Sequence, residues 1–176
     1  KGHDVKIADL RLERDAIGVY LETIETFRPD AILLNLTTTG AESEYTLIGM
    51  TPRHVKKIAF GTHAQSMHEE AFKKGVDFVL LGDPEAGVSN LIEHHLDGES
   101  AAGVLTSRQH DKPAARWDDL DTMPLPALDL IDNRRYHSSI VRRGRRFTLL
   151  LGSRGCPFAC TYCLYPTLFG SDNRTR

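Results

Sequence analysis

Three cysteines, Cys156, Cys160 and Cys163, lie within one stretch of eight residues, and the chain has no other cysteine. Their C-x3-C-x2-C spacing lets one short loop turn all three sulfur atoms toward a single soft metal centre. No fourth cysteine is present, so one coordination position of such a centre is left for another ligand. A metal site with an open position indicates chemistry, whereas a closed site indicates structural support.

Two other uses of these cysteines stay open. A disulfide is disfavoured by the odd cysteine count, by the close spacing and by the lack of a secretory signal. A structural zinc site would combine three thiolates with a histidine, and His137 is the nearest upstream histidine. Such zinc sites usually take their ligands from two separated segments, whereas the cysteines here form a single group.

The segment 153–163 closely resembles the signature of radical S-adenosylmethionine (radical SAM) enzymes. The resemblance implies that Cys156, Cys160 and Cys163 hold three irons of a 4Fe-4S cluster, and that S-adenosylmethionine binds the fourth iron. In that family an electron from the cluster cleaves the cofactor to methionine and a 5'-deoxyadenosyl radical, which removes a hydrogen atom from the substrate. Tyr162, which precedes the last cysteine, would lie near the adenine; its other interpretation is packing against the loop.

The first hundred residues alternate between strand patterns and helix patterns. Periodicity and turn residues predict strands at 5–10, 31–36, 58–60 and 76–81, and helices at 17–27, 42–50, 68–74 and from about 86 to 96. The continuous apolar run 31–36 predicts a strand that is covered on both faces. Repeated strand-then-helix units require right-handed crossovers, so we expect an α/β fold with a mainly parallel sheet and helices on both sides.

Ligands of such sheets bind beyond the carboxyl ends of the strands. The expected loops at these ends are 37–40 (Thr-Thr-Thr-Gly), 61–64 (Gly-Thr-His-Ala) and 82–85 (Gly-Asp-Pro-Glu), which are small and polar. Glycine lets a ligand approach the backbone, and threonine hydroxyls supply hydrogen bonds. Taken alone, these loops would suit a nucleotide, a flavin or a corrin equally well.

Their order ahead of the cysteines resembles the N-terminal domain of the cobalamin-dependent radical SAM enzymes. Residues 61–64 match the Gly-x-His loop of that family, and residues 82–85 match its Gly-Asp/Glu-x-Glu loop. The resemblance implies cobalamin contacts from Thr37, Thr38, Gly61, His63, Gly82 and Glu85. The Asp-x-His-x-x-Gly motif that carries a cobalt-ligating histidine has no match here, so His63 is either a neighbour of the corrin or a loop histidine bonded to backbone.

The resemblance implies three parts: a flavodoxin-like (Rossmann-like) cobalamin-binding domain at 1–98, an acidic, proline-marked connector at 99–146, and a radical SAM domain that starts at 147. In this interpretation residues 147–151 are the first strand of a (β/α) barrel, and the basic run 142–146 is a solvated turn before it. A full barrel needs roughly 200 residues or more. We therefore expect that the chain is an internal fragment of a longer enzyme, truncated at both ends and inactive by itself.

Composition narrows the possible partners. The formal net charge is -2 and no apolar run is long enough to span a bilayer, so we expect a cytoplasmic protein without a nucleic-acid partner or a membrane span. The resemblance implies a small-molecule substrate, methylated or cyclised at an unactivated carbon, and an electron donor such as flavodoxin or ferredoxin. Two alternatives stay open: a radical SAM methylthiotransferase, and a non-enzymatic cobalamin- or nucleotide-binding module with a structural zinc loop.

Overall fold

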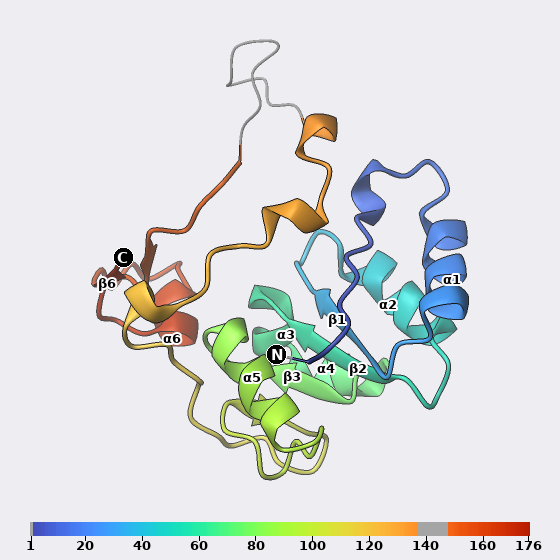
Figure 1. The fold of residues 1–176 in the computed structure, drawn as a ribbon. Coiled ribbons are helices and arrows are strands. Elements are labelled where there is room, and N and C mark those ends of the chain that lie inside the picture. The colour runs from blue at the N-terminus through green and yellow to red at the C-terminus, as the bar shows by residue number, and fades with distance from the viewer. Residues whose placement is uncertain (1, 137–147) are drawn as a thin grey trace. The chain divides into compact units, whose positions relative to one another are not determined.

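A computed structural model describes residues 2–136 and 148–176 (Figure 1). The chain divides into two compact units. The first comprises Lys1–Arg28 and Met123–Gly152, and the second comprises Pro29–Thr122 and Ser153–Arg176. His137, the basic run 142–146 and the first residue of the strand expected at 147–151 lie outside the described residues.

The second unit is built on a sheet whose strands are β1 (Ala31–Asn35), β2 (Lys56–Phe60), β3 (Phe78–Leu80) and β4 (Val104–Leu105). Among the described residues the strand order is β1-β2-β3-β4. The first three strands are parallel, and β4 pairs with β3 in the antiparallel direction. The expected parallel α/β sheet is therefore confirmed, while the short antiparallel strand β4 was not predicted.

Helices cover both faces of this sheet. The helices of the second unit are α2 (Ala41–Met50), α3 (Thr62–Ser66), α4 (His68–Lys73), α5 (Pro84–Glu93) and α6 (Tyr165–Phe169). Because side chains alternate along a strand, Ala59 and Val79 face one core with α2, α3 and α4. Ile58, Phe78 and Leu80 face the opposite core, to which α5 contributes Leu91.

The edge strand β1 and two of the loops that follow the parallel strands differ from the prediction. Strand β1 is an edge strand, and the side chain of Leu33 is 47% exposed, so the prediction that this strand is covered on both faces is wrong. The expected loop 61–64 is also wrong in part, because α3 begins at Thr62, directly after Gly61. Likewise, α5 begins at Pro84, since proline suits the first turn of a helix.

The first unit contains α1 (Ala16–Phe27) and the 3₁₀ helices Leu10–Leu12, Leu128–Leu130 and Asn133–Arg135. The carboxylate of Asp15 accepts a hydrogen bond from the backbone of Gly18 and caps α1, and Arg28 ends the helix in the left-handed conformation. The guanidinium of Arg135 bonds Glu13 across 2.8 Å and so joins the two sequence segments of this unit.

Two predicted strands are absent from the described residues. Residues 5–9 form no strand, and a 3₁₀ helix begins at residue 10. The described part of the strand expected at 147–151, residues 148–151, is also non-regular and exposed. A strand is stabilised by hydrogen bonds to a neighbouring strand, and in the described residues neither segment has such a neighbour.

Among residues 2–136 and 148–176, no helix combines the length and the apolar character needed to cross a lipid bilayer.

Candidate active site: the cysteine loop and its ionic anchor

The cysteine loop, residues 155–164, begins directly after strand β5 (Ser153–Arg154). This strand pairs in the antiparallel direction with β6 (Arg174–Thr175), and helix α6 lies between the loop and β6. Cys156 is half-buried, whereas Cys160 and Cys163 are exposed, and all three are free thiols. The backbone N–H of Cys163 donates to the carbonyl of Cys160 across 3.1 Å, so these two cysteines share one tight turn.

Gly155 fixes the start of the loop. Its φ of +85° is a left-handed conformation, and a Cβ at this position would overlap the carbonyl oxygen of Asp172. The next residue, Cys156, donates its backbone N–H to the carbonyl of Gly170 across 3.2 Å. The first cysteine is therefore held by backbone geometry that only glycine accommodates without strain.

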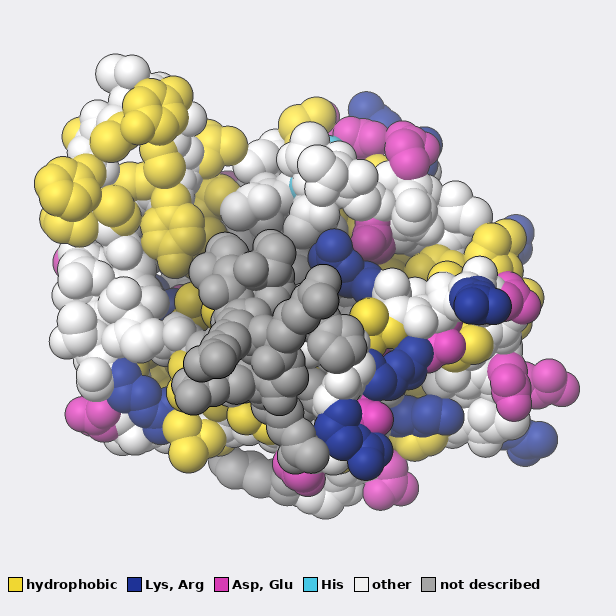
Figure 2. Space-filling view, turned by 90° about the horizontal axis from the view of Figure 1, so that it is seen from above, with side chains coloured by type: hydrophobic (Ala, Val, Ile, Leu, Met, Phe, Trp, Pro, Cys, Tyr) yellow, Lys and Arg dark blue, Asp and Glu magenta, His cyan; other side chains and the backbone are white. Residues whose placement is uncertain are grey.

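The donor set of the loop suits an iron-sulfur cluster. Three free thiols on one short loop are soft ligands, and the loop exposes two of them to an incoming inorganic centre. The aromatic side chains of Phe158 and Tyr162 are also exposed, Tyr162 by 89%, so Tyr162 does not pack against the loop. Figure 2 shows hydrophobic side chains gathered over this end of the second unit. An exposed patch of this kind marks a surface for a ligand or partner.

A buried ion cluster attaches the loop to the sheet of the same unit. Asp83, at the end of β3, has a side chain that is 1% exposed. Its carboxylate accepts hydrogen bonds from Arg174 across 2.6 Å, from the backbone of Trp117 across 2.9 Å, and from Arg154 across 3.4 Å. Both arginine side chains are also buried. Because a buried charge needs a partner, these contacts fix β5 and β6, and with them both ends of the segment that carries the cysteines.

Glu85 completes the charge balance of this cluster. Arg154 donates to its two carboxylate oxygens across 2.6 and 3.3 Å, in the forked geometry typical of guanidinium groups. Burial lowers the pKa of Arg154, but the hydrogen bonds and charge of Glu85 outweigh it and raise that pKa overall. The two carboxylates and two guanidinium groups of this cluster therefore carry no net charge together.

A second, exposed ion pair supports the same end of the segment. Arg116 donates to both carboxylate oxygens of Asp172 across 2.8 and 2.7 Å. These hydrogen bonds lower the pKa of Asp172 to about 2. The backbone carbonyl of Asp172 is also the group that a Cβ at Gly155 would overlap. The Arg116–Asp172 pair therefore lies next to the start of the cysteine loop.

The anchoring residues were not identified from the sequence. Arg154 lies in the cysteine segment 153–163 and Asp83 lies in the loop 82–85, but neither was predicted to form an ion pair. Their pairing joins residues 71 positions apart, and the pairing with Arg174 spans 91. No local pattern predicts such long-range charge partners.

The residues expected to contact cobalamin lie at the carboxyl ends of β1, β2 and β3, which are adjacent parallel strands. Thr37 and Thr38 are exposed there, and Gly61 is half-buried. Beyond the carboxyl end of β3, other parts of the chain occupy the position that a ligand would need. Gly82 is buried and pairs with Ala115, and its N–H donates to Gln65 across 2.8 Å. Thr37 and Thr38 are accessible to a ligand, whereas Gly61 is covered by Asn35 and Leu36, and Gly82 and Glu85 are already engaged by protein groups.

His63 lies in the first turn of α3, and its side chain points between helices. The ring is 6.2 Å from the ring of Tyr45, centroid to centroid, and its Nε2 atom is 4.0 Å from Glu70. The backbone N–H of His63 donates to the carbonyl of Leu36. A role of His63 beside a corrin stays a prediction.

No protein-family model matches the chain. The chain is 28% identical to hopanoid C-3 methylase of Methylococcus capsulatus over 98% of its own length and 35% of that protein. It is 32% identical to the anaerobic magnesium-protoporphyrin IX monomethyl ester cyclase of Synechocystis sp. over 92% of its length and 34% of that protein. It is 25% identical to a tRNA-2-methylthio-N(6)-dimethylallyladenosine synthase of Thermosipho africanus over 97% of its length and 34% of that protein.

The chain spans 20–38% of the length of the curated relatives that it matches. Their names describe methyltransferases, a cyclase and a methylthio-synthase. The similarity covers both the sheet and the cysteine loop, because four of the matches extend over more than nine tenths of this chain.

Proposed function

We propose that this chain is part of a radical SAM enzyme, and that Cys156, Cys160 and Cys163 bind its 4Fe-4S cluster. The observation that carries the proposal is the loop itself: three free thiols of suitable spacing on a segment whose start is fixed by Gly155 and by the buried arginines. Relatives named as a methylase and a cyclase support it. When bound, the cluster supplies the electron that cleaves S-adenosylmethionine and so provides a hydrogen-abstracting radical.

The residues of the chain have distinct tasks in this proposal. The three thiolates hold the iron, and the exposed ring of Tyr162 offers a stacking surface for adenine. Asp83, Arg154 and Arg174 would position the loop, since their charges are balanced within the cluster that they form with Glu85. Positioning of this kind matters because small displacements of reacting groups cost much of an enzyme's rate.

Anaerobic reconstitution with iron and sulfide tests the cluster. We expect about four irons per chain and a brown, absorbing protein. Replacing any one of the cysteines, as in Cys156→Ser, should abolish most of this binding. The matched variant Thr161→Ala, which changes an exposed residue of the same loop, should retain it. A colourless protein that carries zinc after anaerobic preparation would instead support the structural zinc loop.

We further propose that the carboxyl edge of β1 and β2 binds cobalamin, and that the complete enzyme methylates or cyclises an unactivated carbon of a small-molecule substrate. The support is the exposure of Thr37 and Thr38 beside Gly61, together with the resemblance of this domain order. A bound corrin supplies a methyl group or a second redox centre. The threonine hydroxyls would hydrogen-bond its polar groups.

Titration with methylcobalamin tests this finer proposal. The variants Thr37→Val and Thr38→Val should weaken binding, followed by corrin absorbance, by at least about tenfold when combined. Thr46→Val, in the middle of α2, is the matched control because its hydroxyl bonds within its own helix. Unchanged binding in the double variant would remove cobalamin from this edge and leave the cluster proposal intact.

The methylthiotransferase alternative is supported by one relative. Enzymes of that type are expected to bring cysteines for a second cluster in the N-terminal domain, and residues 1–150 of this chain contain none. A product that gains the mass of one methyl group supports methyl transfer, whereas a gain that includes sulfur supports the alternative. A flavodoxin or a ferredoxin is the proposed electron donor.

A further inference from the structure

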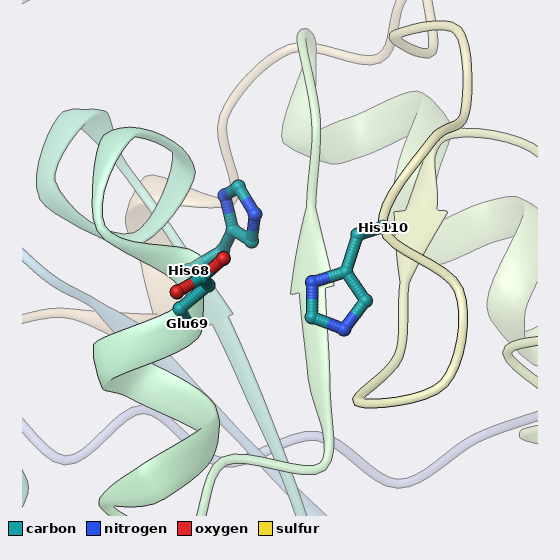
Figure 3. Close-up of side chains that lie close together, drawn as sticks. All are labelled: His68, Glu69 and His110. Atoms are coloured by element: carbon teal, nitrogen blue, oxygen red, sulfur yellow. The ribbon is translucent and has the colours of Figure 1, made fainter.

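A group of two histidines and a glutamate lies on the second unit, on elements other than the cysteine loop. His68 and Glu69 begin helix α4, and His110 follows the turn after β4. One ligand atom from each of the three residues lies within 4.8 Å of the other two. Figure 3 shows the Glu69 carboxylate beside His68, and the two imidazole rings have centroids 5.5 Å apart and planes inclined by 65°.

The hydrogen bonds of the two rings determine which nitrogen is available. The Nδ1 atom of His68 lies 3.1 Å from the carbonyl oxygen of Gln65, and the Nε2 atom of His110 lies 2.9 Å from the carbonyl oxygen of Ser107. A carbonyl oxygen only accepts, so in each neutral ring the nitrogen facing it carries the hydrogen. The lone pairs therefore remain on His68 Nε2 and His110 Nδ1, which point toward one another in Figure 3.

This arrangement is the one that metal-ligating histidines usually show. Such a histidine donates its second ring N–H to a carbonyl or carboxylate, which fixes the tautomer and the orientation of the ring. Both rings also pack edge-on against Phe72, with centroids 6.3 and 5.5 Å away, so their orientations are restricted further. In the described residues no cation pairs with Glu69, whose carboxylate is exposed.

We propose that His68, Glu69 and His110 form a binding site for a borderline divalent metal ion, with Zn²⁺ as the ion that fits best. Two imidazoles and a carboxylate are a ligand set typical of zinc, with the fourth position open to water. Bond lengths of 2.0–2.2 Å place tetrahedral ligands about 3.4 Å apart, so the three groups need to close in by about 1.4 Å or less. Glu69 is exposed, so its carboxylate can move toward the two rings while these keep their hydrogen bonds to Gln65 and Ser107.

The ion would join two parts of the unit that, in the described residues, are already in contact through the rings of His68, Phe72 and His110. It would connect the start of α4 to the turn 106–109, and it would stabilise the folded state because the unfolded chain does not bring the ligands together. The site is independent of the proposed cluster, since it shares no residue with the cysteine loop.

The test uses the chain with Cys156, Cys160 and Cys163 replaced by serine, so that zinc cannot bind the thiols. Calorimetric titration with Zn²⁺ should show one equivalent bound, and zinc should raise the midpoint of thermal unfolding. His110→Gln and Glu69→Gln should each weaken binding by at least about tenfold and remove most of the thermal shift. His54→Gln, a change at an exposed histidine outside the group, should leave both unchanged.

The result that overturns the proposal is equally specific. The site is excluded if the variants His110→Gln and Glu69→Gln bind zinc as tightly as the parent chain. It is also excluded if His54→Gln weakens zinc binding as much as these two variants do. His110 and Glu69 lie on the surface, so their variants are expected to keep the melting temperature of the metal-free protein, which is the measurement that confirms folding. Because thiols are absent throughout, a negative result leaves the cluster proposal untouched.

Discussion

The guanidinium of Arg174 donates to the buried carboxylate of Asp83 across 2.6 Å, and so attaches the strand after the cysteine loop to the end of β3. Arg154, on the strand before the loop, contacts the other oxygen of the same carboxylate. One aspartate thus holds both ends of the segment that carries the three thiols.

The first prediction concerns this aspartate. Asp83→Asn leaves two buried guanidinium groups without their full counter-charge, so we expect the free energy of unfolding to fall by about 3–5 kcal/mol. Chemical denaturation measures it. The matched control is Asp118→Asn, because Asp118 is 84% exposed in its ion pair with Arg116 and should cost less than about 1 kcal/mol.

The double variant Asp83→Asn, Arg174→Met sharpens this test. Removing both partners leaves less uncompensated charge than removing one, so part of the lost stability should return. If the double variant loses more unfolding free energy than the two single variants lose together, the ion pair is not the source of the effect.

Gly155 gives a prediction about the cysteine loop. An alanine there would be strained at a φ of +85° and would meet the carbonyl of Asp172, so Gly155→Ala should displace Cys156 and lower the iron content after reconstitution. Gly152→Ala is the control, because a Cβ at Gly152 meets no atom within 4 Å. Equal iron contents in the two variants would contradict this role.

The ion pair of Asp172 predicts a dependence on pH. Its pKa is lowered to about 2, chiefly by its hydrogen bonds with Arg116, whereas in the unfolded chain an aspartate titrates near 3.9. Around and between these values the unfolded state binds more protons, so the contribution of Asp172 to stability is complete above about pH 5 and is lost as the pH falls toward 2.

Comparison with Asp172→Asn measures that contribution. The difference in urea midpoint between the two proteins should widen from pH 2 to about pH 5 and stay constant from there to pH 6. The side chain is 56% exposed, so solvent screening keeps the effect small. A difference that does not change with pH would show that the charge of Asp172 is not involved.

Lys112 supports the segment that leads into β4. Its ammonium donates to the carbonyls of Gly98, Glu99 and Ala101 across 2.6–2.9 Å. Lys112→Met keeps the apolar stem but removes the three donors, and should cost about 1–3 kcal/mol of unfolding free energy. Hydrogen exchange should increase across residues 98–105, whereas the exposed control Lys73→Met should leave it unchanged.

The apolar runs predicted the three parallel strands of the sheet. Together with the spacing of apolar residues in α1 and α5, the runs of β1 to β3 indicated the parallel α/β arrangement. Strand β4 was missed because two residues carry no periodic signal. The strand predicted at 5–10 is wrong for the opposite reason. Val5 and Ile7 alternate with polar residues, yet in the described residues no strand lies beside them to supply hydrogen bonds.

The candidate site was predictable only where its chemistry is local. The cysteine spacing predicted the candidate metal-binding loop, since its proposed ligands lie close together along the chain. The anchor formed by Asp83, Arg154 and Arg174, and the pair of His68 with His110, depend on contacts between distant segments, and charge or residue type alone does not determine such partners.

The 91-residue separation between Asp83 and Arg174 also sets an order of events during synthesis. At translation rates of roughly 5–20 residues per second, Arg174 leaves the ribosome roughly 5–18 s after Asp83. Until Arg154 and Arg174 have been synthesised, the carboxylate of Asp83 lacks the two guanidinium groups that neutralise it in the folded unit. The three cysteines lie between these arginines in the sequence, so any metal that they bind is acquired only after the residues of the sheet have left the ribosome.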